Sequence, residues 1–450
     1  MVATGDILYR IIFLILIALS NPRVQTLLII MQAKSVLKEL DYYVNKSTEV
    51  LISTISRWRD VEKEDIKKVI EKYIDVFVIS PVTLDPVGVI KRLEHLMNTH
   101  DEYLRSASRR IVGLDDRNVV NTVMNVLAGV NSVYTLYKYL RHLVVSASKS
   151  ESLLAAYQIQ MVLPRIRLLA ASYYDAAKAF SVISTIGDSA GPYVARMLAR
   201  EFGTEFEKCK YDEQACVASA EWEGRKIYIV KACGPAPNLC NFGRVVYNLG
   251  KELSDSLKAI ITIDAALKLE GEPTGDVQVG IGAAIGDPGH EKYKMETIAA
   301  ELNVPLMAVI IKESLGEAIV PMSKEIADGC KKAKEEVLEL IKEMVPEGGS
   351  VIVVGVGNTS GVANGLEEDF ELPEARITVD LDPYMERKYE IRTKLVDEEG
   401  TVIRRTFKPG DYVGKIVEEN GRRMIIEEVS AKVPREISEF GMPLLMTSGS

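Results

Sequence analysis

The pattern of apolar residues changes abruptly near Phe180, and this change constrains the fold more than any other feature of the sequence. Before this point, apolar residues recur every three or four positions, as in amphipathic helices. After it, short continuous apolar runs alternate with glycine-containing loops and helical stretches. Such runs are typical of parallel strands that are buried on both faces. The sequence therefore predicts a helical region followed by an α/β region.

The second region is expected to be an α/β domain in which a three-layer, mostly parallel sheet carries helices on both faces. The predicted strands cover residues 226–230, 259–263, 277–281, 306–311 and 351–356. The predicted helices cover residues 191–201, 242–257, 293–302 and 323–344. In sheets of this kind, ligands bind beyond the carboxyl ends of the strands. The loops that follow the strands are therefore where a functional site is expected.

Four segments follow from these patterns, because a chain of 450 residues can hold two or three domains that each bury a core. They are a hydrophobic anchor segment at 1–31, a helical region at 32–182, the α/β domain at 183–365 and a small β-rich extension at 366–450. In the extension, apolar and polar residues alternate as in antiparallel strands. The alternating runs lie at residues 376–381, 389–395 and 401–405.

The anchor segment consists of an apolar run at 7–19 and a second patch at 26–31, separated by an interruption around Pro22. The first run alone is shorter than the roughly 20 residues of an uninterrupted spanning helix. A cleaved signal peptide lacks support because there is no basic n-region or small-residue cleavage site. We expect a membrane anchor within residues 7–31, with a helix buried against the protein as the alternative. Basic residues follow the segment and place the bulk of the chain in the cytoplasm: Arg23, Lys34 and Lys38.

The overall composition describes a folded, mildly acidic protein. The hydrophobic fraction is 47% and the net charge is −9. A general nucleic-acid-binding protein presents a basic face. Here the local clusters of Lys and Arg are interleaved with Glu, so we do not expect a nucleic-acid partner.

The cysteines do not have the spacing of a zinc site, which needs tight two-residue gaps. Four of the five form two pairs with the same six-residue gap: Cys209 with Cys216, and Cys233 with Cys240. Buried thiols are one interpretation, and a disulfide between Cys209 and Cys216 across the loop at 210–214 is another. The many Glu, Lys and Arg residues are compatible with a heat-adapted source, in which intracellular disulfides occur.

Two aspartates are the candidate catalytic residues. Asp188 lies in a glycine-flanked segment that precedes a predicted helix, and Asp264 closes the predicted strand at 259–263. Acids at the end of a buried strand and on a glycine loop are typical of α/β hydrolytic sites. Two close carboxylates can share one proton and activate a water molecule for attack on an amide. They can instead bind a divalent metal, which lowers the pKa of its bound water.

His290 favours the metal-dependent version of this site. It is the only histidine in the α/β region, and it lies in a glycine-containing loop after a strand. With Asp188 and Asp264 it would form a carboxylate–carboxylate–histidine set suited to zinc or nickel. The residues expected to build the surrounding loops are Gly187, Gly191, Gly234, Gly286, Asp287, Gly289, Gly357 and Asn358.

Two alternatives to a catalytic site remain open. Asp188 could be the N-cap of a helix with Pro192 in its first turn, and Asp264 could cap a helix that begins at Ala265. The run at 351–358 nearly matches the G-x-G-x-x-G spacing of nucleotide-binding loops. Acidic residues and Pro373 end that pattern, so no dinucleotide-binding βαβ unit is expected.

The run Gly187-Asp188-Ser189-Ala190-Gly191-Pro192 resembles the acidic loop of the hydrogenase maturation proteases and the spore germination protease. In that loop an acid stands three places before a glycine at the start of the first helix. Ile263-Asp264-Ala265 is similar to their second acid motif, and residues 277–290 and 304–309 resemble the next segment of the germination protease. The resemblance covers residues 183–330 and implies a phosphorylase/hydrolase-like fold with a peptidase-like site at Asp188 and Asp264.

In those proteases a Val-Gly-x-Gly-Asn loop precedes the acidic loop, whereas here residues 354–358 follow it. Either the sheet is permuted or this motif has another role. The whole chain resembles an uncharacterised archaeal family, domain of unknown function 1512. That resemblance implies a hydrophobic N-terminal segment and no established activity.

We therefore expect a membrane-associated protein with a peptidase-like or hydrolase-like carboxylate site, metal-dependent in one version, whose substrate is a protein or peptide. The alternatives are a non-catalytic ligand-binding or scaffold protein on the same fold, and other chemistry such as phosphorylase-like transfer. A catalytic site requires the carboxylates of Asp188 and Asp264 to lie close together. A scaffold would leave them apart, each bonded to its own helix N-terminus.

Overall fold

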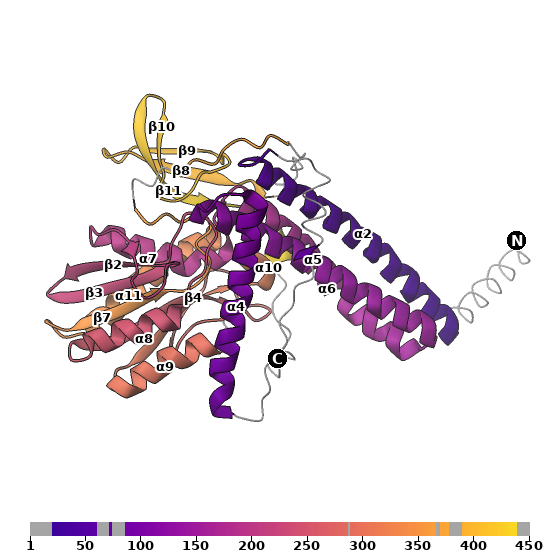
Figure 1. Cartoon of the computed structure of the whole chain (residues 1–450), viewed down its shortest axis with the longest axis horizontal. Helices are drawn as coiled ribbons and strands as arrows, with labels where there is room; N and C mark the ends of the chain where they lie inside the picture. Colours follow the sequence, from indigo (N-terminus) through magenta and orange to yellow (C-terminus); the bar gives the residue numbers. More distant parts are fainter. Residues whose placement is uncertain are drawn as a thin grey trace, which may run out of the picture.

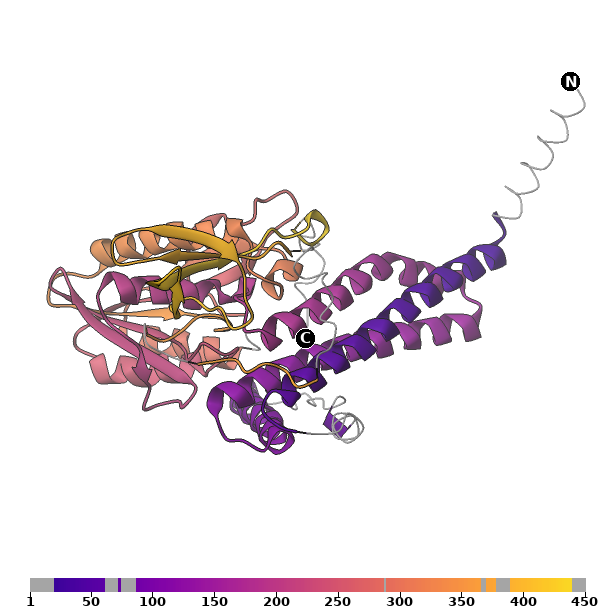
Figure 2. The same ribbon diagram turned by 90° about the horizontal axis from the view of Figure 1, so that it is seen from above.

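The computed structural model describes residues 20–60, 72–73, 86–286, 289–365, 370–377 and 389–438. A long helical arm projects from one side of a body that contains two sheets (Figure 1). Seen from above, the arm extends away from both sheets (Figure 2). The apolar run at 7–19, which carries most of the expected anchor, lies outside the described residues.

The arm is built from three long helices that pack side by side, α2 (Pro22–Ser56), α5 (Arg117–Ser150) and α6 (Leu153–Ser181). A fourth helix, α4 (Pro86–Val112), crosses the body beside α5 and α9. An Asn, Asp or Ser side chain caps the start of each arm helix by accepting a backbone hydrogen bond. By length and composition, α5 is the one described helix that could cross a membrane, but 56% of its most apolar window is buried inside the protein.

The body contains a seven-stranded mixed sheet with the order β1-β2-β3-β7-β4-β6-β5. Its strands are β1 (Glu207–Lys208), β2 (Ala215–Trp222), β3 (Arg225–Ala232), β4 (Leu257–Leu267), β5 (Val277–Ile281), β6 (Leu306–Glu313) and β7 (Ser350–Gly355). All five predicted strands are confirmed. The four central strands run parallel, but β1, β2 and β5 pair antiparallel at the two edges. The sheet is therefore mixed rather than mostly parallel.

Two core clusters cover the sheet, and successive residues of β4 contribute to different clusters. Ile261 and Ile263 pack in the cluster that contains α7 (Ala190–Glu201) and α11 (Lys324–Met344). Ile260 packs in the cluster that contains α8 (Phe242–Leu253) and α9 (His290–Leu302). A strand that is apolar at every position can bury both of its faces in this way.

The C-terminal extension is a four-stranded antiparallel sheet with the order β10-β11-β8-β9. Its strands are β8 (Arg392–Val396), β9 (Val402–Thr406), β10 (Ile416–Glu419) and β11 (Arg422–Ser430), and a short helix, α13 (Arg435–Ser438), follows. The antiparallel strands predicted at 389–395 and 401–405 are confirmed as β8 and β9. Of the predicted strand at 376–381, residues 378–381 lie outside the described residues, and 376–377 form a bend.

The alternative of a disulfide between Cys209 and Cys216 is wrong, because Cys216 is bonded to Cys233 (Cα–Cα 5.1 Å). Cys216 and Cys233 both lie in the α7/α11 cluster, whereas Cys209 packs against the α8/α9 cluster. Neighbouring residues of a strand point to opposite faces of a sheet, so the hairpin turns Cys209 away from Cys216. Cys209, Cys240 and Cys330 are free thiols.

Candidate acidic site at the carboxyl end of the sheet

Asp188 lies in a short 3-10 turn, η1 (Gly187–Ser189), which connects the helical region to α7. Its carboxylate does not cap α7, since the N-cap residue is Ser189. Instead, the backbone N–H of Asn358 donates a hydrogen bond to Asp188 Oδ2 at 2.8 Å. The capping interpretation of Asp188 is therefore wrong, and the side chain is aimed at a loop 170 positions away in the sequence.

A close backbone approach brings this turn to the sheet. A Cβ atom at Gly191 would lie 2.1 Å from the carbonyl oxygen of Val356 and 2.5 Å from that of Ile263. The start of α7 can therefore rest directly on the ends of β7 and β4 only because residue 191 has no side chain. This contact places Asp188 beside the strand that carries Asp264.

Asp264 is a residue of β4, which continues to Leu267, so it does not cap a helix. The neighbouring strand β7 ends at Gly355, which pairs with Ile263 of β4. Asp264 lies one residue beyond this last pair. The side chain is only 6% exposed, and the backbone N–H groups of Ala265 and Gly286 donate hydrogen bonds to its carboxylate. Asp264 therefore lies at the carboxyl ends of the parallel strands.

Two glutamates that the sequence analysis missed complete the acidic cluster. Glu313 ends β6 and Glu317 lies in α10 (Leu315–Ala318), and each is 1% exposed. A Cβ atom at Gly187 would lie 2.4 Å from Glu313 Oε2. That oxygen is shielded from solvent and has no hydrogen-bond partner within the described residues. We define the acidic cluster as Asp188, Asp264, Glu313 and Glu317.

The sequence did contain a signal for both glutamates. Glu313 lies two residues beyond the predicted strand at 306–311, and Asp264 lies one residue beyond the predicted strand at 259–263. Ser314 and Glu317 have the S-x-x-E spacing of a capping box, and the structure contains that box. Glu317 also accepts a hydrogen bond from Thr274, which accepts one from Lys268.

Burial dominates the electrostatics of the acidic cluster. Desolvation raises the pKa of Asp188 to about 6, although the hydrogen bond from Asn358 opposes this rise. Desolvation and the charge of Asp188 raise the pKa of Asp264 well above its ordinary value. The pKa of Glu313 is also raised well above its ordinary value, by desolvation and by the charges of Asp188, Glu317 and Asp264. At neutral pH the cluster can therefore hold both ionised and protonated carboxyl groups.

The loop after β7 supports Asp188 and does not form a nucleotide-binding unit. A Cβ atom at Gly357 would lie 2.1 Å from the carbonyl oxygen of Asp188, and its φ of +123° favours glycine. Asn358 also donates from Nδ2 to Asn125 Oδ1 of α5 at 3.1 Å. Within the described residues the next element after β7 is strand β8, so β7 does not lead into the helix of a βαβ dinucleotide unit there.

The other predicted loop residues have different surroundings. A Cβ atom at Gly234, after β3, would lie 1.8 Å from the carbonyl oxygen of Val362, so this loop packs against the one that follows β7. Gly286 donates to Asp264, whereas Gly289 caps α9 with a φ of +112°. Asp287 lies outside the described residues.

His290 is the first residue of α9, and its Nε2 atom lies 3.3 Å from Glu291 Oε1. Its ring is therefore paired with Glu291, and His290 is not among the groups that shift the pKa of Asp188 or Asp264. Within the described part of the chain, no three His, Cys, Asp or Glu groups are arranged closely enough to hold a metal ion.

The fold and this cluster together define a mixed α/β protein that gathers buried carboxyl groups at the carboxyl edge of its parallel strands. Residues 7–182 match the N-terminal domain of the protein family of unknown function DUF1512, and residues 186–363 match its C-terminal domain. The chain belongs to this family. A search of curated proteins gives no match.

Proposed function

We propose that this chain is a membrane-associated, hydrolase-like protein in which Asp188 and Asp264 form a catalytic carboxylate pair that acts on a protein or peptide. One observation carries the proposal. Two carboxyl groups from separate elements, η1 and β4, lie close enough for the charge of one to raise the pKa of the other. Perturbed pKa values of this kind gather at catalytic sites. We also propose that the large sheet is the middle of three layers, between its two helical clusters.

The raised pKa values suit complementary roles in amide hydrolysis. With a pKa of about 6, Asp188 is ionised at neutral pH and can accept a proton from water as the oxygen attacks the carbonyl carbon. Asp264, whose pKa is raised by desolvation and by the charge of Asp188, would be the partner that donates a proton to the carbonyl oxygen. The tetrahedral intermediate then collapses and the C–N bond breaks. Asp188 returns its proton to the leaving amine, and Asp264 takes back the hydroxyl proton as the C=O bond reforms. Because the two groups are coupled, their titration belongs to the pair.

A metal-dependent version of the same site is a second candidate. It is favoured by the buried Oε2 atom of Glu313, which has no hydrogen-bond partner within the described residues. A zinc or nickel ion would compensate for the gathered carboxylate charge and would acidify a bound water molecule. Asp188 and Asp264 would hold the ion, whereas His290, the third expected ligand, is paired with Glu291.

The proposed membrane association is based on exposed apolar side chains of the arm. Apolar side chains are exposed near the start of α2 and around the turn from α5 to α6, at the end of the arm farthest from the sheets (Figure 1). They include Leu27 (57%), Met31 (58%), Leu154 (69%) and Met161 (81%). The apolar run at 7–19 precedes the same end. We propose that residues 7–31 anchor the chain and that its bulk lies in the cytoplasm.

The decisive experiment measures cleavage of a fluorogenic peptide library and of labelled casein by the full chain in detergent, with and without added zinc or nickel. We expect Asp188→Asn and Asp264→Asn each to lower the rate by about 10²- to 10⁴-fold. Glu270→Gln is the matched control, because Glu270 is an exposed carboxylate three residues past the end of β4. Unchanged cleavage by both aspartate variants would contradict the proposal.

The same preparations separate the two versions of the site. Metal content is measured for the wild-type chain and for the Asp188→Asn, Asp264→Asn double variant. Near-zero metal in both, with wild-type activity that withstands a chelator, would exclude the metal-dependent version. Peptide binding without turnover by the wild-type chain would instead support the non-catalytic, ligand-binding alternative.

A further inference from the structure

Strand β5 forms one edge of the large sheet and is open to solvent. It pairs with β6 on one side and has no strand partner on the other side within the described residues. Four of its five residues are exposed, and the exposed fraction reaches 42% at Val279 and 93% at Ile281. An open edge with exposed apolar side chains is a template for pairing with another chain.

The other edge strands carry charges of the kind that prevents such pairing. Among the described strands, the remaining edges are β1, β9 and β10, which contain Lys208, Arg404 and Glu418 respectively. Strand β5, Val277–Ile281, contains no charged residue and no proline. Charges and prolines on an edge strand oppose edge-to-edge association, so the edge at β5 is the one that lacks this protection.

The backbone of β5 presents a regular row of hydrogen-bonding groups to solvent. The N–H of Gly282 donates to the carbonyl oxygen of Leu306 at 2.8 Å, and this pair continues the register of β5 with β6. In an antiparallel pair, such bonds occur at every second residue, so the even-numbered residues of β5 bond to β6. The N–H and C=O groups of Val277, Val279 and Ile281 therefore point away from β6.

We propose that β5 pairs antiparallel with β5 of a second copy of this chain, about a two-fold axis at Val279. In this register Val279 lies opposite the partner's Val279, and Val277 lies opposite the partner's Ile281. The three outward-facing residues then form hydrogen-bonded pairs, and their side chains form apolar cross-strand pairs on one face of the sheet. Asp276 lies opposite the partner's Gly282, so no like charges meet.

The match of this edge with itself favours a second copy over an unrelated peptide. A two-fold contact between identical subunits requires one surface that is complementary to itself. Three residues placed symmetrically about Val279 meet this requirement, with two backbone bonds in each pair. The contact would join two seven-stranded sheets into one continuous sheet. Because the paired strand is short, we expect a reversible dimer, and its formation does not depend on the chemistry proposed for the acidic cluster.

Cysteine crosslinking of the full chain in detergent tests the register. The background variant is Cys209→Ser, Cys240→Ser, which removes the two free thiols that are not buried. We expect Val279→Cys to form a disulfide-linked dimer under mild oxidation, because opposed residues of a hydrogen-bonded pair have Cα atoms about 5.5 Å apart. Ile281→Cys is the matched control. It is more exposed, but in this register it lies roughly 13 Å along the strand from the partner's Ile281, so it should not crosslink.

Sedimentation analysis over a dilution series measures the dimer directly. We expect the wild-type chain to associate reversibly and Val279→Lys to raise the Kd at least about fivefold, because two like charges then lie opposite each other. Val402→Lys is the control, since Val402 is similarly exposed (48%) on the edge strand β9. A wild-type chain that stays monomeric would overturn the proposal and leave the edge to an extended peptide. Equal crosslinking by the two cysteine variants, or a dimer that Val279→Lys does not weaken, would also overturn it.

Discussion

At the scale of single residues, ionisation of the buried Asp188 carboxyl group lowers the free energy of unfolding. Asp188 has a pKa of about 6 in the folded chain, against an ordinary value of 3.8. The folded state therefore binds a proton more tightly than the unfolded state does. The free energy of unfolding falls as the pH rises from about 4 to about 6, and it remains lower at higher pH.

Asp188→Asn should therefore stabilise the protein at pH 8, by on the order of 1 to 3 kcal/mol. The amide removes the buried charge and keeps an oxygen that can accept from the N–H of Asn358. Below about pH 3 the gain should disappear, because the wild-type carboxyl group is then mostly protonated in both states. Urea unfolding at both pH values measures this, with Glu270→Gln as control. A variant that is less stable at pH 8 would contradict the proposed desolvation.

Gly191→Ala tests the backbone contact that carries Asp188 to the sheet. The new Cβ would meet backbone oxygens at 2.1 and 2.5 Å, and backbone cannot rotate aside as a side chain can. We expect a loss of roughly 2 to 3 kcal/mol or more. Gly280→Ala is the control, since no atom lies within 4 Å of its new Cβ. Thermal unfolding compares the two, and equal melting temperatures would show that α7 does not rest on β4 and β7.

At the scale of elements, Cys216 and Cys233 join β2 to the loop that follows β3, 17 positions apart. A loop of this length predicts a stabilisation of about 3 kcal/mol. Removing the bond with Cys216→Ser and Cys233→Ser should therefore lower the melting temperature. Cys209→Ser should change it little, because that thiol is free. Peptide mapping without reductant that finds a Cys209–Cys216 bridge would contradict this pairing.

Individual strands could be predicted from the sequence better than the pairing of strands and of cysteines. The central strands β3, β4 and β7 are continuous apolar runs, which local pattern reveals. Strand β2 was missed because its outer half, up to Trp222, alternates small and polar residues near the sheet edge. The disulfide partner was missed because pairing depends on which face of the sheet each thiol occupies.

The acidic cluster was only half predicted for a related reason. Asp188 and Asp264 each have a local signal, a glycine loop and a strand end. The hydrogen bond from Asn358 depends on β7 lying between β3 and β4, an order that differs from the order along the chain. This order also explains how a Gly-x-Gly-Asn motif that comes late in the sequence reaches Asp188.

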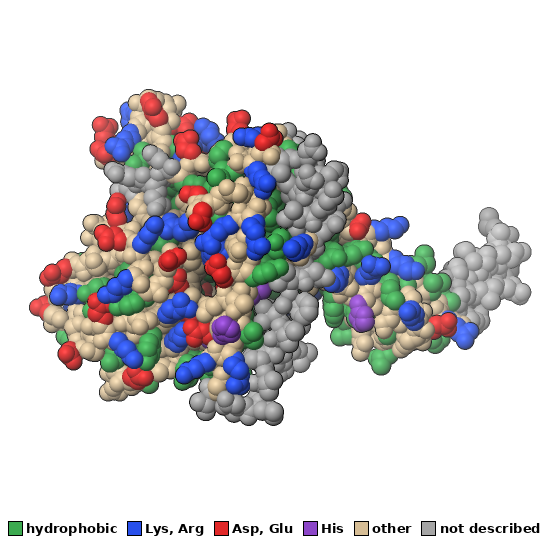
Figure 3. Space-filling model, viewed as in Figure 1, with side chains coloured by type: hydrophobic (Ala, Val, Ile, Leu, Met, Phe, Trp, Pro, Cys, Tyr) green, Lys and Arg blue, Asp and Glu red, His purple; other side chains and the backbone are tan. Residues whose placement is uncertain are grey.

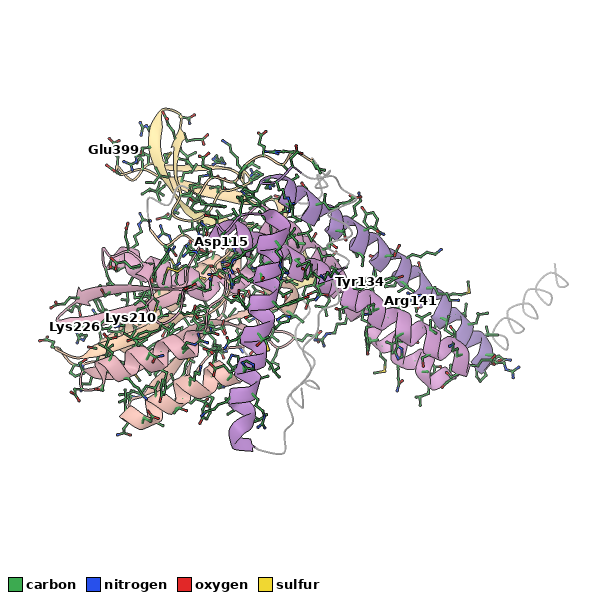
Figure 4. All side chains as sticks on the ribbon, in the orientation of Figure 1. Asp115, Tyr134, Arg141, Lys210, Lys226 and Glu399 are labelled. Atoms are coloured by element: carbon green, nitrogen blue, oxygen red, sulfur yellow. A yellow bond between two sulfur atoms is a disulfide. The ribbon has the colours of Figure 1, made fainter. Side chains whose placement is uncertain are left out.

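At the scale of the whole molecule, the arm separates the acidic cluster from the end that we propose for membrane contact. Helix α6 begins at that end and finishes six residues before Gly187, and its 29 residues span about 43 Å. Apolar and basic side chains are mixed along the visible face of the arm (Figure 3). Arg141 of α5, labelled in Figure 4, is a basic residue of the arm. Basic residues near the proposed contact are attracted to an anionic bilayer surface. The chain as a whole is acidic and is not attracted to such a surface.

A tryptophan placed at the end of the arm can report this contact. Met161 is 81% exposed on α6, and Ile281 is 93% exposed at the end of β5 on the sheet edge. In vesicles that contain anionic and brominated lipids, we expect the fluorescence of Met161→Trp to be quenched beyond the wild-type level, which reflects Trp58 and Trp222. Ile281→Trp should show no added quenching, because β5 lies in the body. Equal quenching of the two variants, or none in either, would contradict membrane contact through the arm.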